Sequence, residues 1–192
     1  MKPIKTNYNG ILFRSKLEAE WAKFFDAIDI PYIYEPEGFE FEDGTRYLPD
    51  FYLPDANQWF EVKGIINDID KHKIEMLGNE SKKDVIVGYS DGKTEMYDVG
   101  WLPHAISWEI PFINDCPCCR KKCFITGWGS YRCRCCDAYD GNHYLHAILD
   151  DCYSGINREE WLKRAKIDVR NLTNNDTSRY RTISQYPIEI PF

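Results

Sequence analysis

Two carboxylates and a lysine in the first third of the chain have the spacing of a metal-dependent hydrolytic site. Asp50 follows Pro49 in one predicted strand, and Glu61 and Lys63 lie two residues apart in the next. Side chains two apart on a strand share a face, so Glu61 and Lys63 point the same way while Val62 points into the core. The preceding antiparallel strand can bring Asp50 beside them.

These groups suit phosphodiester cleavage. A divalent ion held by carboxylates can neutralise the phosphate and activate a water, and a nearby lysine can orient or deprotonate that water. Magnesium prefers one or two carboxylates and keeps positions for water and phosphate oxygens. We therefore expect Asp50, Glu61 and the backbone carbonyl of Val62 to bind Mg²⁺ or Mn²⁺, and Lys63 to act on the attacking water.

Glu-x-Lys alone is common on strands with one solvated face, so a solvated hairpin stays open as the alternative. A second Pro-Asp pair ends at Asp55, but that residue lies in the turn predicted at 54–57 and is assigned to the turn.

A helix is predicted immediately upstream of the strands. Ser15 with Glu18 matches a capping box, and Pro31 ends the helical pattern. The apolar positions at helical spacing are Leu17, Trp21, Phe24 and Ile28. Strands are predicted at 32–34, 39–41, 47–53, 58–63, 85–89 and 94–97, with a second helix at about 68–79. This order indicates an α/β fold with a mixed sheet.

Composition narrows the class of protein. The 192 residues are 43% hydrophobic and 15% aromatic, which can fill a core and excludes wholesale disorder. No apolar run approaches the roughly 20 residues of a membrane helix, and the N-terminus lacks the apolar stretch of a signal peptide. We expect a soluble, cytoplasmic protein without a membrane partner.

The net charge of −7 is unevenly distributed. Residues 1–110 hold 12 Lys and Arg against 21 Asp and Glu (−9), and residues 111–192 hold 12 against 10 (+2). Basic clusters at 120–122, 132–134 and 163–170 could meet phosphates, and solubility alone is the alternative.

Eight cysteines point to metal binding in a reducing compartment, because seven of them lie between Cys116 and Cys136. Two C-x-x-C pairs can close a tetrahedral Cys₄ site around a structural Zn²⁺. The predicted ligands are Cys116, Cys119, Cys133 and Cys136. The remaining cysteines are Cys118, Cys123, Cys135 and Cys152.

A second zinc site from Cys123, Cys135, His143 and His146 is conceivable, but ordinary helix histidines are the favoured interpretation. Residues 127–132 combine aromatic and basic side chains, so they could stack on bases, grip phosphates, or pack the ribbon against the first domain. Further helices are predicted at 143–151 and 159–169.

Two segments of the chain resemble a known nuclease family. Pro-Asp at 49–50 with Glu-Val-Lys at 61–63 is similar to the motif of PD-(D/E)xK nucleases. Phe-Arg-Ser-Lys-Leu-Glu at 13–18 resembles the start of phage-type endonuclease I Holliday-junction resolvases, which continue to a segment like residues 48–54. The resemblance covers about residues 11–97, and those resolvases lack the cysteine block.

The resemblance implies that a helix acid joins the site, and it places that acid at Glu18. Glu18 and Glu20 are about 200° apart around a helix, so both cannot face one metal. Lys16 and Arg14 could touch a phosphate, although residues at an exposed helix start are usually just solvated.

The expected protein has a restriction-endonuclease-like domain at 1–110, a zinc ribbon at 111–140 and a helical tail at 141–192. The expected activity is metal-dependent endonucleolytic hydrolysis of DNA. Branched DNA or a Holliday junction is the substrate that the resemblance implies, and cutting a junction symmetrically would call for a homodimer. The alternatives are a restriction- or defence-type nuclease on linear duplex and a non-catalytic DNA-binding or zinc-ribbon scaffold. A phage-encoded protein would act in the host cytoplasm.

Overall fold

The computed structural model describes residues 3–99, 107–109, 111–115, 119, 121–125 and 134–135. The helices in these residues are α1 (Lys16–Ala27) and α2 (Asp68–Ser81). The strands are β1 (Thr6–Tyr8), β2 (Ile11–Phe13), β3 (Ile33–Tyr34), β4 (Phe39–Glu40), β5 (Arg46–Tyr47), β6 (Phe51–Leu53), β7 (Gln58–Lys63), β8 (Val85–Tyr89), β9 (Thr94–Asp98), β10 (Ser107–Glu109), β11 (Phe112–Asp115) and β12 (Lys122–Ile125).

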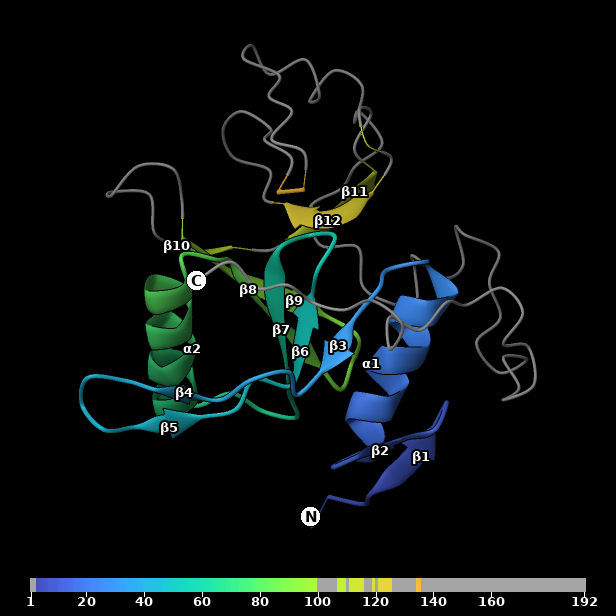
Figure 1. The fold of residues 1–192 in the computed structure, drawn as a ribbon, viewed down its shortest axis with the longest axis horizontal. Helices are drawn as coiled ribbons and strands as arrows, with labels where there is room; N and C mark the ends of the chain where they lie inside the picture. Colours follow the sequence, from blue (N-terminus) through green and yellow to red (C-terminus); the bar gives the residue numbers. More distant parts are fainter. Residues whose placement is uncertain are drawn as a thin grey trace.

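A six-stranded mixed sheet forms the centre of the molecule, in the order β10-β9-β8-β7-β6-β3 (Figure 1). β7 and β8 run parallel and are joined through α2, while the other neighbouring pairs are antiparallel. The β6–β7 register pairs Phe51 with Phe60, so the next position outward sets Asp50 opposite Glu61. The predicted α/β fold with a mixed sheet is confirmed for the described residues.

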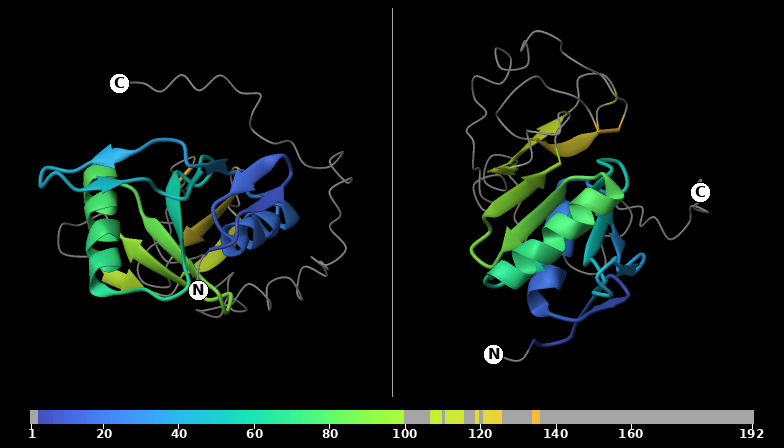
Figure 2. Two further views of the ribbon diagram at one scale, coloured as in Figure 1. Left: turned by 90° about the horizontal axis from the view of Figure 1, so that it is seen from below. Right: turned by 90° about the vertical axis from the view of Figure 1, so that its left-hand side faces the viewer.

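The two helices cover opposite faces of this sheet (Figure 2). Alternate residues of β7 point to opposite faces, so Phe60 packs with α1 and Trp59 packs with α2. The α1 side is strongly aromatic: the Trp21 and Phe60 ring centroids lie 4.9 Å apart, as do those of Phe25 and Phe60. Each such ring contributes roughly 2–3 kcal/mol through the apolar area that it removes from water.

Both helices begin at side-chain caps, which fix where the chain turns toward the sheet. The Ser15 side chain accepts a hydrogen bond from the Glu18 amide at the start of α1, as its capping-box pattern predicts. Asn67 and Asp70 form a full capping box at the start of α2. Helix α1 ends at Ala27, before Pro31, because Asp29 takes a left-handed conformation with φ of 56°.

The single strand predicted at 47–53 is wrong, because two short strands occupy this stretch. Arg46–Tyr47 pairs with β4 in a separate hairpin, whereas Phe51–Leu53 joins the central sheet. Residues 48–50 connect them, and the apolar alternation gives no sign of this break. The β1–β2 hairpin, which pairs Thr6 with Phe13, was not anticipated either.

The hairpin of β11 and β12 packs into the core that α1 covers. Cys123, Phe124 and Ile125 are buried there, and the Phe124 ring lies 5.8 Å from that of Phe60. The Gln58 amide, fully buried, donates to the Phe124 carbonyl at 2.7 Å and accepts from the Phe124 amide at 3.0 Å. This part of the predicted ribbon segment 111–140 is therefore built onto the sheet.

None of the helices within the described residues is long and apolar enough to cross a membrane. The helices predicted at 143–151 and 159–169, and with them the tail segment 141–192, lie outside the described residues.

Candidate active site

The structure brings the predicted catalytic residues together at one end of the β6–β7 pair. Asp50 immediately precedes β6, while Glu61 and Lys63 lie at the end of β7. Glu18, in the first turn of α1, is close enough for its charge to act on Asp50. The shared position follows from the antiparallel register, since the start of β6 and the end of β7 meet at the same edge of the sheet.

Asp50 and Glu61 are buried carboxylates held by the backbone of their neighbours. Asp50 is 5% exposed and Glu61 is 1% exposed. The Asp50 amide donates to Glu61 Oε1 at 3.0 Å, and the Val62 amide donates to Asp50 Oδ2 at 2.8 Å. These two bonds fix both carboxylates side by side and leave one oxygen of each turned to other partners.

Those two remaining oxygens each contact a cationic side chain. Lys63 Nζ donates to Glu61 Oε2 at 3.0 Å, and Arg14 Nη2 donates to Asp50 Oδ1 at 2.7 Å. The same pair of carboxylate oxygens is what a divalent ion would bind. The contacts thus mark a place for positive charge between Asp50 and Glu61.

The close packing of these charges shifts the pKa values of Asp50 and Lys63. Burial first, and then the negative charge of Glu61, raise the pKa of Asp50 well above its usual range. Burial alone would lower the pKa of Lys63, but the neighbouring Glu61 and Asp50 carboxylates outweigh it and raise that pKa above its ordinary value. Asp50 and Glu61 are two buried carboxylates placed side by side, and their mutual repulsion is an unfavourable arrangement that further positive charge would relieve.

Glu18 makes three hydrogen bonds through its side-chain oxygens. Oε1 accepts from Ser15 Oγ at 2.8 Å, and Oε2 accepts from the Tyr34 hydroxyl at 2.6 Å and from the Arg14 amide at 3.1 Å. Glu18 therefore caps its helix and ties the ends of β2 and β3 to the site. In this arrangement it faces Asp50 as a neighbouring charge, and its catalytic role stays a prediction.

The structure adds residues to the site that the sequence did not single out. Tyr34 ends β3, and its hydroxyl accepts from the Arg14 amide at 3.0 Å as well as donating to Glu18. The Tyr47 ring lies 5.9 Å from Lys63 Nζ, and burial together with the Glu61 charge raises the pKa of the Tyr47 hydroxyl. Glu35 forms an ion pair with Arg14. No local pattern in the sequence marks these residues, because they arrive from three different strands or loops.

Asp55 and Glu20, the two acidic residues that the sequence analysis left out of the site, lie away from the carboxylate cluster. Asp55, in the β6–β7 turn, receives a hydrogen bond from Lys121 Nζ at 2.6 Å. Glu20 lies on the outer side of α1, where its carboxylate is 3.6 Å from Lys16 Nζ.

A Mg²⁺ or Mn²⁺ ion fits the chemistry of this donor set. Asp50 Oδ1 and Glu61 Oε2 would be the protein ligands, and the Val62 carbonyl remains a predicted third. In the described part of the chain, no group of three or more His, Cys, Asp or Glu side chains is arranged so that it could hold a metal ion. Magnesium does not require such a group, since it usually keeps several waters and binds through one or two carboxylates and the substrate phosphate.

Of the predicted zinc ligands, Cys119 is described, while Cys116, Cys133 and Cys136 lie outside the described residues. The Lys121 ammonium is close enough to the Cys119 and Cys135 thiols for both to raise its pKa, after the larger effect of its hydrogen bond to Asp55. Cys119 and Cys135 therefore both lie within electrostatic reach of Lys121.

The cysteines of the conceivable second site differ in their surroundings. Cys123 is buried in the α1-side core, whereas Cys135 is exposed. His143 and His146 lie outside the described residues, as do residues 127–132.

The hairpin of β11 and β12, called here the cysteine-bearing hairpin because it contains Cys119 and Cys123, docks at the end of β7 opposite the candidate active site. It donates or accepts hydrogen bonds with Gln58, the first residue of β7, and with Asp55 in the preceding turn, and its Phe124 ring packs against Phe60. Lys63 is the last residue of β7, about 17 Å away at ~3.3 Å per residue. The described part of this hairpin supports the sheet and does not contribute a group to the carboxylate cluster.

Comparison with known proteins adds no relative. No model of a protein family matches the chain, and no curated protein matches it.

Proposed function

We propose that this protein is a Mg²⁺-dependent endodeoxyribonuclease that hydrolyses DNA phosphodiester bonds at the Asp50–Glu61–Lys63 cluster. The observation that carries the proposal is the pair of buried carboxylates fixed by the Asp50 and Val62 amides, each with one oxygen on a cationic side chain. A solvated hairpin face, the alternative weighed on sequence, would not bury both carboxylates.

The residues divide the work as follows. Asp50 and Glu61 hold the divalent ion, which when bound supplies a Lewis acid for the phosphate and lowers the pKa of water. The Lys63 ammonium, which donates to Glu61 Oε2, is placed to orient the attacking water and to neutralise charge on the phosphate. Glu18 and Tyr34 hold the start of α1 against the site through their 2.6 Å hydrogen bond.

The substrate class is proposed from the resemblance to endonuclease I resolvases: branched DNA, including four-way junctions, cut by a homodimer. The cysteine segment is proposed to bind one structural Zn²⁺, and the basic residues around it are proposed to contact the DNA phosphates. The linear-duplex nuclease and the non-catalytic scaffold are the competing outcomes.

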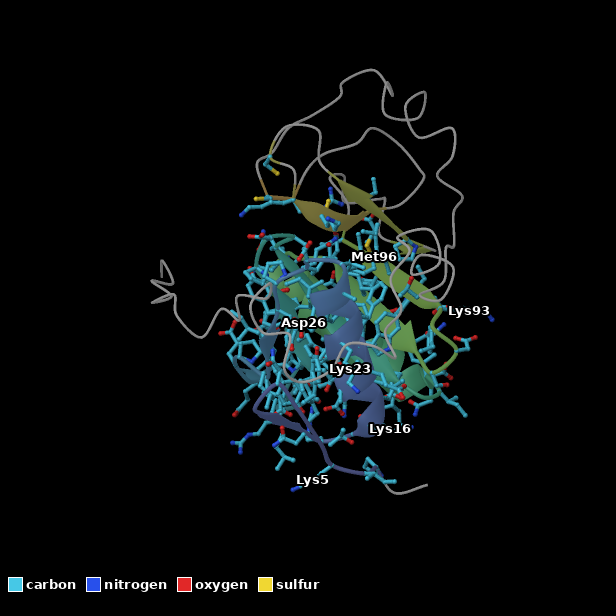
Figure 3. All side chains as sticks on the ribbon, turned by 90° about the vertical axis from the view of Figure 1, so that its right-hand side faces the viewer. Lys5, Lys16, Lys23, Asp26, Lys93 and Met96 are labelled. Carbon is cyan, nitrogen blue, oxygen red and sulfur yellow. The ribbon has the colours of Figure 1, made fainter. Side chains whose placement is uncertain are left out.

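One assay separates these functions. The full chain is incubated with Mg²⁺ and linear, supercoiled, single-stranded and four-way-junction DNA, beside Lys63→Ala and a matched Lys93→Ala. Lys93 lies in the β8–β9 turn, paired with Asp91 at the periphery of the molecule (Figure 3).

Loss of Lys63 should reduce cleavage by roughly 10²–10⁴-fold, the usual contribution of a positioned proton-transfer or charge-stabilising group, while Lys93→Ala should cleave normally. Equal cleavage of every DNA form would refute the junction preference. Absence of any Lys63-dependent cleavage would favour the scaffold.

A further inference from the structure

Arg14 holds an unusual position for a residue at a helix start. Its guanidinium reaches into the carboxylate cluster, where Nη2 contacts Asp50 Oδ1 at 2.7 Å and Nε pairs with Glu35. Its backbone amide is fixed by the Tyr34 hydroxyl at 3.0 Å and by Glu18 Oε2 at 3.1 Å. The backbone of Arg14 is therefore anchored at the site, while its side chain is 48% exposed.

The oxygen that Arg14 contacts is the one a metal would need. Asp50 Oδ2 already accepts the Val62 amide, so Oδ1 is the oxygen of Asp50 directed toward a cation. A guanidinium and a divalent ion cannot both occupy the same lone-pair direction at short distance, because like charges there repel. An ion that takes the lone-pair direction now held by Arg14 therefore displaces Arg14 from Asp50.

Arg14 is better placed to leave than Lys63, the other cation in the cluster. The Lys63 side chain is 21% exposed and lies between buried carboxylates, whereas Arg14 is about half exposed. Glu35 offers the guanidinium a second anchor outside the carboxylate pair. An arginine cannot give up its proton in response, so it must move and find another anion.

The anion that arrives with the metal is a phosphate of the substrate. The ion uses its open positions for phosphate oxygens, which brings a phosphate next to the released guanidinium. The planar fork of an arginine matches two phosphate oxygens at once.

We propose that Arg14 is a metal-dependent phosphate ligand: the divalent ion displaces its guanidinium from Asp50, and the released guanidinium binds the DNA backbone beside the cleaved bond. This inference rests on the proposed nuclease function and adds a substrate-binding residue to it. Arg14 would then weaken binding of the metal ion and strengthen binding of DNA, so its removal should change the two affinities in opposite directions.

The first measurement is binding of Mn²⁺ to the full chain, followed by electron paramagnetic resonance of the free ion. Arg14→Gln should bind Mn²⁺ about five-fold more tightly than the wild type, which corresponds to about 1 kcal/mol. Asp50→Asn should bind it at least about ten-fold more weakly. Arg46→Gln is the matched control, because Arg46 makes an exposed ion pair with Glu40 and should leave the affinity unchanged.

The second measurement is binding of a fluorescein-labelled duplex and a four-way junction across a series of salt concentrations, with Ca²⁺ present to prevent cleavage. With Ca²⁺, Arg14→Gln should bind DNA more weakly, and its slope of log affinity against log salt should be shallower by about 0.9, one phosphate contact. Without a divalent ion, the slopes of the wild type and Arg14→Gln should agree, because Asp50 then retains the guanidinium.

The outcomes separate this inference from the proposed function. If Asp50→Asn loses Mn²⁺ binding but Arg14→Gln binds it no more tightly than the wild type, the displacement is refuted and the nuclease site stands. Tighter Mn²⁺ binding with an unchanged salt slope in Ca²⁺ refutes the phosphate contact. A wild type that binds no Mn²⁺ refutes the metal site itself.

Arg14→Lys guards against a folding defect in Arg14→Gln, which thermal unfolding would reveal. A lysine keeps the charge but cannot reach Asp50 and Glu35 with separate nitrogens of one fork. It should bind Mn²⁺ about two-fold more tightly than the wild type and keep the Ca²⁺-dependent salt slope. The inference would be overturned by an Arg14→Lys protein that binds Mn²⁺ with wild-type affinity and whose slope of log DNA affinity against log salt is equally shallow with and without Ca²⁺.

Discussion

Replacing Gln58 with leucine should loosen the cysteine-bearing hairpin from the central sheet. Gln58 is fully buried at the start of β7, and its amide forms a reciprocal pair of hydrogen bonds with the backbone of Phe124 in β12. The same Nε2 lies 3.2 Å from Asp84 Oδ2. Leucine has a similar size but supplies none of these hydrogen bonds.

The expected loss in the free energy of unfolding follows from the backbone groups that Gln58→Leu leaves without a hydrogen-bond partner. The amide and carbonyl of Phe124 would both lose the Gln58 side chain in a buried position, at a cost of about 1–3 kcal/mol each. Asp84 keeps its 2.7 Å hydrogen bond from Arg134, so it adds little. Burial of the apolar leucine side chain offsets part of this cost, so we expect a net loss of about 3 kcal/mol in the free energy of unfolding.

Guanidinium denaturation followed by tryptophan fluorescence measures this loss. Tyr52→Phe is the control, because it removes an exposed hydrogen bond to Asn57 and should change stability by less than about 0.5 kcal/mol. A Gln58→Leu protein within about 1 kcal/mol of the wild type would contradict the reasoning. The proposed DNA cleavage should persist in this variant at low temperature, because the carboxylates lie at the other end of β7.

Three further predictions concern the packing of the core at Gly88, the titration of Asp26 and the zinc content. Gly88→Ala should destabilise the protein by about 2 kcal/mol in denaturant unfolding, because its Cβ would lie 2.5 Å from atoms of the buried Phe60 and Trp21 rings. Asp26→Asn should stabilise the protein at neutral pH by roughly 1–2 kcal/mol, because burial raises the Asp26 pKa to about 6 although Tyr8 donates to it. Zinc analysis should find about one ion per chain, and its removal with a chelator should lower the melting temperature, because the cysteine-bearing hairpin is part of the core.

The sign of the Asp26 effect can be checked across pH. The folded state holds the proton more tightly than the unfolded chain, so stability falls as pH rises from about 4 to about 6 and is level above that. The two proteins should therefore converge below about pH 4, and a constant difference across this range would exclude the titration of Asp26 as the cause.

The other two predictions have equally direct controls. Gly38→Ala should be tolerated, since the added Cβ would meet only the Tyr47 carbonyl at 3.7 Å. Gly88→Ala with wild-type stability would mean that the Phe60 and Trp21 rings can shift freely. Substantially less than one zinc per chain, in protein purified without chelators, would count against the Cys₄ site.

The candidate active site and the cysteine-bearing hairpin lie at opposite ends of β7. The carboxylates lie where β6 begins and β7 ends, and the cysteine-bearing hairpin holds the opposite end of the same strands. β7 runs between them, so the described part of the hairpin contacts the sheet without adding a group to the carboxylate cluster.

Local patterns in the sequence were enough to predict the main helices and strands. The capping box at Ser15 starts α1, and the alternation around Glu61 places it and Lys63 on one face of a strand, because both features depend only on neighbouring residues. The same locality explains the error at 47–53: the break at residues 48–50 arises because β5 pairs with β4 and β6 pairs with β7.

The sequence by itself determined the α/β plan and the carboxylate and lysine residues of the candidate site, since spacing of two along a strand fixes which side chains share a face. Only the tertiary structure decided what surrounds them. Arg14 and Tyr34 meet Asp50 and Glu18 because a helix start and two strand ends converge, and no rule of spacing links positions so far apart in the chain. The Gln58–Phe124 pair is decided in the same way, since its energy comes from burial that exists only once the hairpin has docked.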